Sequence, residues 1–254
     1  MKIGYICGSS EPDRLCKCLT ALTDLYNIEF FYFTEDRVDI DQKTISGSFW
    51  DKTKLGYAEK STSYPHIIDG TTQMMLPGLC IELGKYSYLT HIPSDDSNKI
   101  LDSIKNSDCC GYLIDSNIKI EKNTGNNFKI RLNVCRGENG EWGLLGMFVL
   151  VGYGKDISSN GWALDRKPKQ FLEMGFGSEW KTLYDEIIFI SRDLPDILQK
   201  GRRIVSLAID VIIDNSSKVK IAGISDTPDY YKCEWQTAKS RILYYNHIYK
   251  SRKC

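Results

Sequence analysis

A chain of 254 residues is long enough for one large domain or two small domains with buried cores. Its hydrophobic content of 42% and charged content of 26% are ordinary globular values, which exclude an intrinsically disordered chain. Thirty-three basic residues balance thirty-three acidic ones, so no net charge is present to attract nucleic acid or an anionic membrane. Composition therefore indicates a globular protein without a nucleic-acid partner.

Cysteine and histidine usage does not point to a metal centre. The nine cysteines include Cys16, Cys18 and the adjacent pair Cys109 and Cys110, none of which has the C-x-x-C spacing of a zinc or redox site. The three histidines are scattered. The opening M-K-I-G-Y-I-C is too short for a signal peptide, and no apolar run could span a bilayer. We expect mostly buried thiols, a cytoplasmic location and no membrane span.

The N-terminal residues predict a strand-helix-strand unit. Residues 2–7 and 29–33 are apolar strand patterns, and residues 13–26 carry leucines at helical spacing, namely Leu15, Leu19, Leu22 and Leu25. Such a unit is typical of a small parallel α/β domain. The intervening Gly8-Ser9-Ser10 lacks the glycine spacing of a dinucleotide-binding loop, so we interpret it as a plain turn.

A β-hairpin is predicted within residues 203–230. Two β-branched runs, at residues 204–213 and 219–224, flank the turn-forming sequence D-N-S-S. Strand alternation places Asp210 on the same face as Ile212 and Asp214. An acid inside such an apolar strand indicates a specific role for its carboxylate.

A second hairpin and a helix precede it. Residues 128–134 and 144–151 form apolar strand patterns around a glycine-containing turn. Residues 180–192 show helical spacing, and Pro195 is expected to interrupt a single long helix unless it opens a second one.

The C-terminal tail predicts an amphipathic helix. Its apolar face comprises Trp235, Ala238, Ile242 and Tyr245, and its basic face comprises Lys239, Arg241 and Lys250. We favour a helix docked on the rest of the protein. The alternative is an exposed aromatic and basic helix that binds a partner or a peptide.

Several segments together resemble the YheC/YheD family of ATP-grasp-like proteins. The segment F-T-E-D-R-V-D-I-D-Q-K-T-I-S-G and the following strand Y-P-H-I-I-D resemble its N-terminal domain, through Phe33, Thr34, Val38, Asp39, Ile45 and Gly47. The strand F-K-I-R-L-N-V resembles the family's F-D-F-R-V-x-V, with Arg131 retained and Lys129 in place of the aspartate. The loop D-I-S-S-N-G resembles the family's S-I-V-S-N and carries Asn160.

The resemblance implies an α/β protein in three parts. Residues 1–70 correspond to a small Rossmann-like, pre-ATP-grasp domain, residues 71–110 to a shortened connector, and residues 111–254 to the C-terminal antiparallel α+β core of an ATP-grasp fold with a terminal helix. The connector is too short for an independent nucleotide-binding lobe, and it contains only Gly78 and Gly84. We therefore expect the central nucleotide lobe and its glycine-rich loop to be largely missing.

The same resemblance implies where an active site would lie. Arg131 and Asn160 match positions near the transferred phosphate, and an arginine fork suits phosphate oxygens. An alternative is that Arg131 is a strand residue paired with a surface carboxylate. Asp210 matches the first magnesium ligand of the hairpin, but Gly223 and Ser225 stand where the family has glutamate and asparagine. Asp210 is therefore interpreted as the remnant of a metal site.

These losses predict a degenerate, non-catalytic member that binds or scaffolds a peptide or an active ATP-grasp paralogue, without a cofactor of its own. The resemblance also implies an association with the spore coat. The alternative is an ATP-dependent carboxylate-amine (peptide) ligase that uses Mg-ATP, forms an acyl phosphate and obtains its missing parts from a second subunit.

Overall fold

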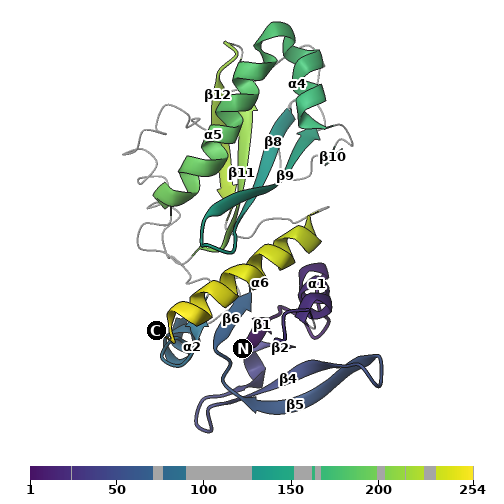
Figure 1. Ribbon diagram of the computed structural model, residues 1–254, viewed down its shortest axis with the longest axis vertical. Coiled ribbons are helices and arrows are strands. Elements are labelled where there is room, and N and C mark those ends of the chain that lie inside the picture. The colour runs from purple at the N-terminus through teal and green to yellow at the C-terminus, as the bar shows by residue number, and fades with distance from the viewer. Residues whose placement is uncertain are drawn as a thin grey trace.

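The computed structural model describes residues 1–23, 25–70, 77–89, 128–151, 162–163, 167–198, 204–214, 216–225 and 233–253. These residues form a seven-stranded sheet and a five-stranded sheet. The C-terminal helix α6 (Glu234–Ser251) lies between the two sheets (Figure 1). The predicted ATP-grasp-like arrangement of a small α/β unit followed by an antiparallel core agrees with this layout.

The first sheet is built on the predicted strand-helix-strand unit. Its strands β1 (Lys2–Ile6) and β2 (Glu29–Phe33) are parallel and are connected by α1 (Arg14–Thr23). The leucines at the first three predicted positions of α1 are buried, whereas Leu25 is 76% exposed because the helix ends before it. Its place on the buried face was therefore predicted wrongly.

The first sheet continues past residue 70, where the sequence placed the end of the N-terminal domain. Strand β6 (Ile67–Gly70) lies parallel to β1 on its other side, and β7 (Tyr88–Leu89) lies parallel to β6. Helix α2 (Pro77–Gly84) connects β6 to β7. The described part of the predicted connector thus contributes the strand β7 to this sheet, together with the helix α2 that precedes it.

A long antiparallel ribbon completes the first sheet. It consists of β4 (Thr44–Asp51) and β5 (Gly56–Ser63). Strand β4 also pairs with β2 and with the short β3 (Val38–Asp39), which follows a single 3-10 turn, η1 (Glu35–Arg37). Strand β5 pairs with β4.

The second sheet is antiparallel, in the order β10-β9-β8-β11-β12. Its strands are β8 (Phe128–Arg136), β9 (Trp142–Val151), β10 (Trp162–Ala163), β11 (Ser206–Ile213) and β12 (Val219–Ser225). Both predicted hairpins are confirmed, as β8–β9 and β11–β12. The predicted helix of residues 94–106 lies outside the described residues.

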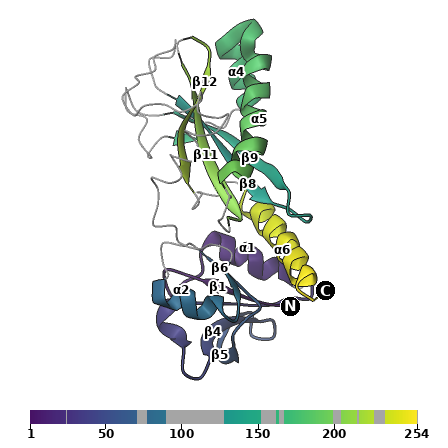
Figure 2. The same ribbon diagram turned by 90° about the vertical axis from the view of Figure 1, so that its left-hand side faces the viewer.

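Two helices cover one face of the second sheet (Figure 2). They are α4 (Pro168–Phe176), which the sequence analysis missed, and α5 (Trp180–Leu198), with the 3-10 turn η4 (Gly177–Glu179) between them. Pro195 lies inside α5 without ending it. The interruption was predicted wrongly, because α5 continues for three residues past Pro195. The proline costs the one backbone hydrogen bond that it cannot donate, and its burial beside Leu194 and Leu198 offsets this cost.

Helix α6 docks on both sheets. Ala238, Ile242 and Tyr245 are fully buried in a core shared with α1, β1 and β2 on one side and with Cys135 and Val205 on the other. The docked-helix interpretation is therefore confirmed. Trp235, which the pattern placed on the buried face, is 48% exposed.

Arg241 was predicted on the basic outer face of α6, but it is only 2% exposed. Its Nη1 donates hydrogen bonds to both carboxylate oxygens of Asp69, at 2.9 and 2.8 Å, and its Nη2 donates one to Ser206 Oγ at 2.6 Å. Asp69 belongs to β6 of the first sheet and Ser206 to β11 of the second. This Asp69–Arg241–Ser206 cluster joins the two sheets through α6. The prediction failed because helical spacing alone does not show that a distant carboxylate meets the arginine.

We expect Arg241→Met to lower the free energy of unfolding by about 3–5 kcal/mol, because it leaves the buried carboxylate of Asp69 without its cation. Lys239→Met, at an exposed position of the same helix, is the matched control and should change it by about 0.5 kcal/mol or less. Urea unfolding followed by circular dichroism measures both. Equal stabilities of the two variants would contradict a joining role for the cluster.

Candidate functional site

Asp210 lies in the middle of β11, on the face of the second sheet opposite the helices. Its neighbours Ile209 and Val211 are fully buried in the core that includes Ile187 of α5. Because side chains alternate along a strand, Asp210 points to the other face. The residue is only 9% exposed, so its carboxylate needs partners.

Two cations of the neighbouring strand β8 hold this carboxylate. Arg131, directly opposite Asp210 in the ladder, donates from Nε to Oδ1 at 2.7 Å and from Nη2 to Oδ2 at 2.9 Å. Lys129 Nζ lies 2.7 Å from the same Oδ2. We call this arrangement the Lys129–Arg131–Asp210 triad. It explains why an acid occurs within an apolar strand.

The triad favours the ionised form of Asp210. Burial alone raises the pKa of this carboxyl, but the hydrogen bonds from Arg131 and Lys129 and their positive charges outweigh burial and hold the pKa below its usual value. The side chains of Lys129 and Arg131 are only 10% and 21% exposed, so water screens the attraction weakly. The carboxylate is thus charged and already neutralised by the protein.

The position of the family's second metal ligand lies beside the triad. Gly223 of β12 is the direct cross-strand partner of Asp210, and Ser225 is the partner of Ala208 two residues away. A bulge between Asp210 and Val211 on this ladder leaves that register in place. A Cβ built on Gly223 would meet nothing within 4 Å. A Cβ at Gly223 would thus find open space beside Asp210, and the match of Gly223 and Ser225 to the family's ligand positions stays a prediction.

The donors present do not fit a magnesium ion. Mg²⁺ sites of this type require one or two carboxylates with free oxygens. Here the one carboxylate has a lysine ammonium and an arginine guanidinium against it. Across the described ranges no group of three or more His, Cys, Asp or Glu side chains could hold a metal ion.

The site residues predicted from the sequence are partly brought together. Arg131 and Asp210 are in direct contact, which agrees with the alternative of a strand arginine paired with a carboxylate, although this carboxylate is nearly buried rather than at the surface. Asn160 lies outside the described residues. Lys129 was noticed only as a departure from the family's aspartate. The signal that could have identified it is its spacing, because Lys129 and Arg131 are two apart and therefore share a strand face.

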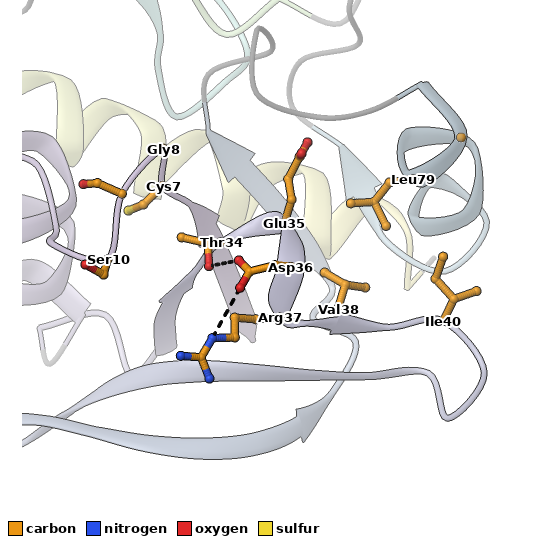
Figure 3. A pocket seen from close by; sticks show the side chains of 12 residues that line it. Cys7, Gly8, Ser10, Thr34, Glu35, Asp36, Arg37, Val38, Ile40 and Leu79 are labelled. Carbon is orange, nitrogen blue, oxygen red and sulfur yellow. Dashed lines mark hydrogen bonds and ion pairs between the residues drawn. The ribbon is translucent and has the colours of Figure 1, made fainter.

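A separate cleft of about 1160 Å³ opens in the first sheet. It lies where the parallel strands β1 and β2 end, the edge at which open α/β sheets place ligands. Figure 3 shows Thr34, Asp36 and Arg37 along one side of it, with the loop of Gly8 and Ser10 on another. Thr34 donates a hydrogen bond to Asp36 at 2.5 Å, which with the nearby Arg37 lowers the pKa of that carboxyl.

The described thiols agree with the expectation of mostly buried cysteines. Five of the six described are buried and all six are free. Burial raises the pKa of Cys135 to about 12, which keeps it protonated. No helix of the described residues is long and apolar enough to cross a membrane.

The sequence model of the YheC/D-like ATP-grasp family matches residues 93–240, which is more than half of the chain. The chain belongs to this family, so the resemblance found in the sequence is confirmed. The match begins within the segment assigned to the connector. The predicted loss of the nucleotide lobe concerns mainly residues outside the described ranges and stays a prediction.

Three solved structures are similar to this chain in fold. The macrocyclase MdnB from Microcystis aeruginosa is 9% identical, with 97% of this chain and 99% of that chain covered and a TM-score of 0.48. VanG D-Ala:D-Ser ligase from Enterococcus faecalis is 11% identical, with 96% and 99% covered and a TM-score of 0.48. A RiPP-associated ATP-grasp ligase from Chryseobacterium gregarium is 9% identical, with 96% and 97% covered and a TM-score of 0.48. No curated protein matches.

We expect Asp210→Asn to reduce the dependence of the free energy of unfolding on pH in the acid range. A carboxyl whose folded pKa is lowered contributes stability above its ordinary pKa, and that stability is lost as pH falls through the folded value. Between about pH 5 and 2 the wild-type free energy of unfolding should therefore fall more steeply than that of the variant. At pH 7 the variant should be less stable, since Lys129 and Arg131 lose their counter-charge.

The control for this variant is Asp193→Asn, at an exposed position of α5. It should leave the acid slope unchanged. Denaturant unfolding at a series of pH values measures the free energy of unfolding of both variants. If its dependence on acid pH is the same in Asp210→Asn as in the wild type, the triad does not lower the pKa of Asp210.

Proposed function

We propose that this protein is a non-catalytic member of the YheC/D-like ATP-grasp family that acts as a binding or scaffolding protein. The observation that carries the proposal is the triad. The carboxylate at the first metal-ligand position is held by Arg131 and by Lys129, and Lys129 stands where the family has an acid.

Electrostatics explains why the triad opposes catalysis. ATP-grasp chemistry concentrates negative charge on phosphates, which divalent metal ions neutralise. A metal at Asp210 must displace an ammonium held at 2.7 Å in a nearly buried site, and it gains no second carboxylate, because Gly223 has no side chain. The lysine thus supplies the positive charge that stabilises Asp210, but it cannot coordinate phosphate oxygens as a metal ion would in the reaction.

The surfaces left for binding are the sheet face of the triad and the cleft at the ends of β1 and β2. The cleft combines apolar side chains such as Val38 and Leu79 with hydroxyl and charged groups such as Thr34 and Arg37. This mixture suits a peptide segment, whose backbone needs hydrogen bonds and whose side chains need apolar contacts. A peptide or an active ATP-grasp paralogue is therefore the proposed partner, and association with the spore coat remains a prediction of family membership.

A ligase that works with a second subunit is the competing function. Membership of the family and the retained Arg131 and Asp210 favour it. It requires that the partner, or residues outside the described ranges, supply the phosphate-binding loop and the missing metal ligands.

Isothermal titration of the isolated chain with Mg-ATP separates the two functions. The non-catalytic protein should show no saturable binding up to about 1 mM nucleotide, the upper end of ordinary enzyme affinities. Micromolar binding by the isolated chain would overturn the proposal and favour the ligase.

Restoring the metal ligands tests whether the triad prevents Mg²⁺ from binding at Asp210. We expect the triple variant Lys129→Met, Gly223→Glu, Ser225→Asn to bind Mg²⁺ at least about tenfold more tightly than the wild type, because it removes the competing ammonium and adds a carboxylate beside Asp210. The variant with only the two β12 substitutions should gain less, since Lys129 still neutralises Asp210.

The matched control replaces Gly223 by Gln, which has nearly the shape of Glu but no charge. Titration with MgCl₂ measures all variants. If the triple variant binds no better than its Gln control, the hairpin does not correspond to the family's metal hairpin.

A further inference from the structure

Two thiols of the first sheet's core lie together beside the cleft. Cys7 directly follows β1, and Cys16 lies in the first turn of α1. Both belong to the buried cluster that packs α1 against β1 and β2. The thiol of Cys16 is hydrogen-bonded to the thiol of Cys7. We call these two residues the dithiol pair. Neither of them takes part in the triad.

The fold anchors the backbone of both cysteines. The N–H of Cys7 donates to the carbonyl of Phe33 at 2.8 Å, which fixes the end of β1 against β2. The carboxylate of Asp13 accepts hydrogen bonds from Tyr5 Oη at 3.0 Å and from the N–H of Cys16 at 2.6 Å. This carboxylate therefore ties the first turn of α1 to β1. Because the thiols already touch, only a small movement separates them from the disulfide length of about 2.05 Å.

Only one thiol of the pair can be reached from outside. Cys7 lines the cleft next to Gly8, Ser9 and Ser10 (Figure 3). Cys16 is fully buried and does not line it. The cleft of about 1160 Å³ is larger than most pockets that hold small molecules. A small-molecule reagent therefore meets Cys7 before Cys16.

Proton affinity divides the roles of the pair in the same way. The hydrogen bond with Cys7 and then burial raise the pKa of Cys16 far above its ordinary value. Cys16 therefore keeps its proton, and its S–H can donate to a thiolate on Cys7. Only a thiolate attacks a disulfide, so the first attack falls to Cys7 and the second to Cys16.

We propose that Cys7 and Cys16 form a reversible disulfide by exchange with a small-molecule disulfide such as oxidised glutathione. In the first step the Cys7 thiolate attacks one sulfur of the reagent, which leaves a mixed disulfide on Cys7 and releases one thiol. In the second step the sulfur of Cys16 attacks that of Cys7, and its proton passes to the departing second thiol. The two cysteines lose two electrons and two protons, and the reagent takes up both as it is reduced to two thiols.

The disulfide would constrain one wall of the cleft. It closes a ring over residues 7–16, which contain the cleft-lining Gly8, Ser9 and Ser10. Because the new bond adjoins the cleft, an external thiol can attack it and return both cysteines to the reduced state. The inference concerns thiol chemistry that is measured without any binding partner, so it goes beyond the proposed function and does not rest on it.

Peptide mapping of the full chain tests the disulfide directly. Trypsin places Cys7, Cys16 and Cys18 on separate peptides, of residues 3–14, 15–17 and 18–37. The folded protein is incubated with oxidised glutathione, its remaining thiols are alkylated, and the digest is analysed by mass spectrometry without reduction. We expect peptide 3–14 joined to peptide 15–17, with the loss of two hydrogen atoms, and we expect dithiothreitol to separate them.

Single variants test the order of the two attacks. Cys16→Ser lacks the second thiol, so glutathione should stay attached to Cys7 and reach a level at least about tenfold above that in the wild type, where the neighbouring thiol displaces it. Cys7→Ser should form no disulfide and leave Cys16 unmodified. Cys18→Ser, on the same helix, is the matched control and should form the 3–14 to 15–17 link as the wild type does.

Circular dichroism checks that each variant folds, and the wild-type result does not depend on any variant. The same reagent applied to the urea-unfolded chain shows that it can modify these cysteines. If it does so while Cys7 and Cys16 of the folded wild type stay free thiols, the proposal is overturned. A disulfide that joins either of them to Cys18 instead, or a Cys16→Ser variant without glutathione on Cys7, also overturns it.

Discussion

The two sheets of this protein depend on one buried guanidinium. Arg241 reaches from α6 to a carboxylate at the end of β6 and to a hydroxyl at the start of β11, and both of these partners are almost fully buried, so each needs hydrogen-bond partners. Placing a charge there costs desolvation free energy, which the double hydrogen bond to Asp69 offsets. The apolar contacts of α6 hold the two sheets together but are not directional. The hydrogen bonds of the cluster are directional, so they fix the orientation of one sheet relative to the other.

The same constraint governs the face where an ATP-grasp enzyme would bind metal. An ionised carboxylate at the middle of β11 cannot stay buried without positive charge near it, and this charge can come from a metal or from the protein. Here Lys129 and Arg131 provide it from the adjacent strand. Under the proposed function, Lys129 and Arg131 supply the positive charge that a metal would otherwise supply, so the strand stays stable without magnesium. The hairpin then serves as a structural element.

Local pattern predicted most of the described elements, because strand alternation and helical spacing are encoded within a few residues. The limits of β2 and the two hairpins β8–β9 and β11–β12 were correct for this reason. The failures concern partners distant in sequence. Arg241 was placed on an outer face because its partner Asp69 is 172 residues away in the sequence. Lys129 was given no role because its partner lies on β11, a strand that begins 77 residues later. Charges in apolar strands and helices become interpretable only when their neighbours in space are known.

The ion pairs of β11 and β5 differ in how far the fold depends on them. In the triad, complementary charges meet on neighbouring strands in a nearly buried site, so Asp210 depends on Lys129 and Arg131 for its charged form. On β5, the exposed Glu59 lies 3.5 Å from Arg37, and such a surface contact contributes little because water screens it. Burial therefore decides which of the two ion pairs constrains the structure, although both join residues that are distant in sequence.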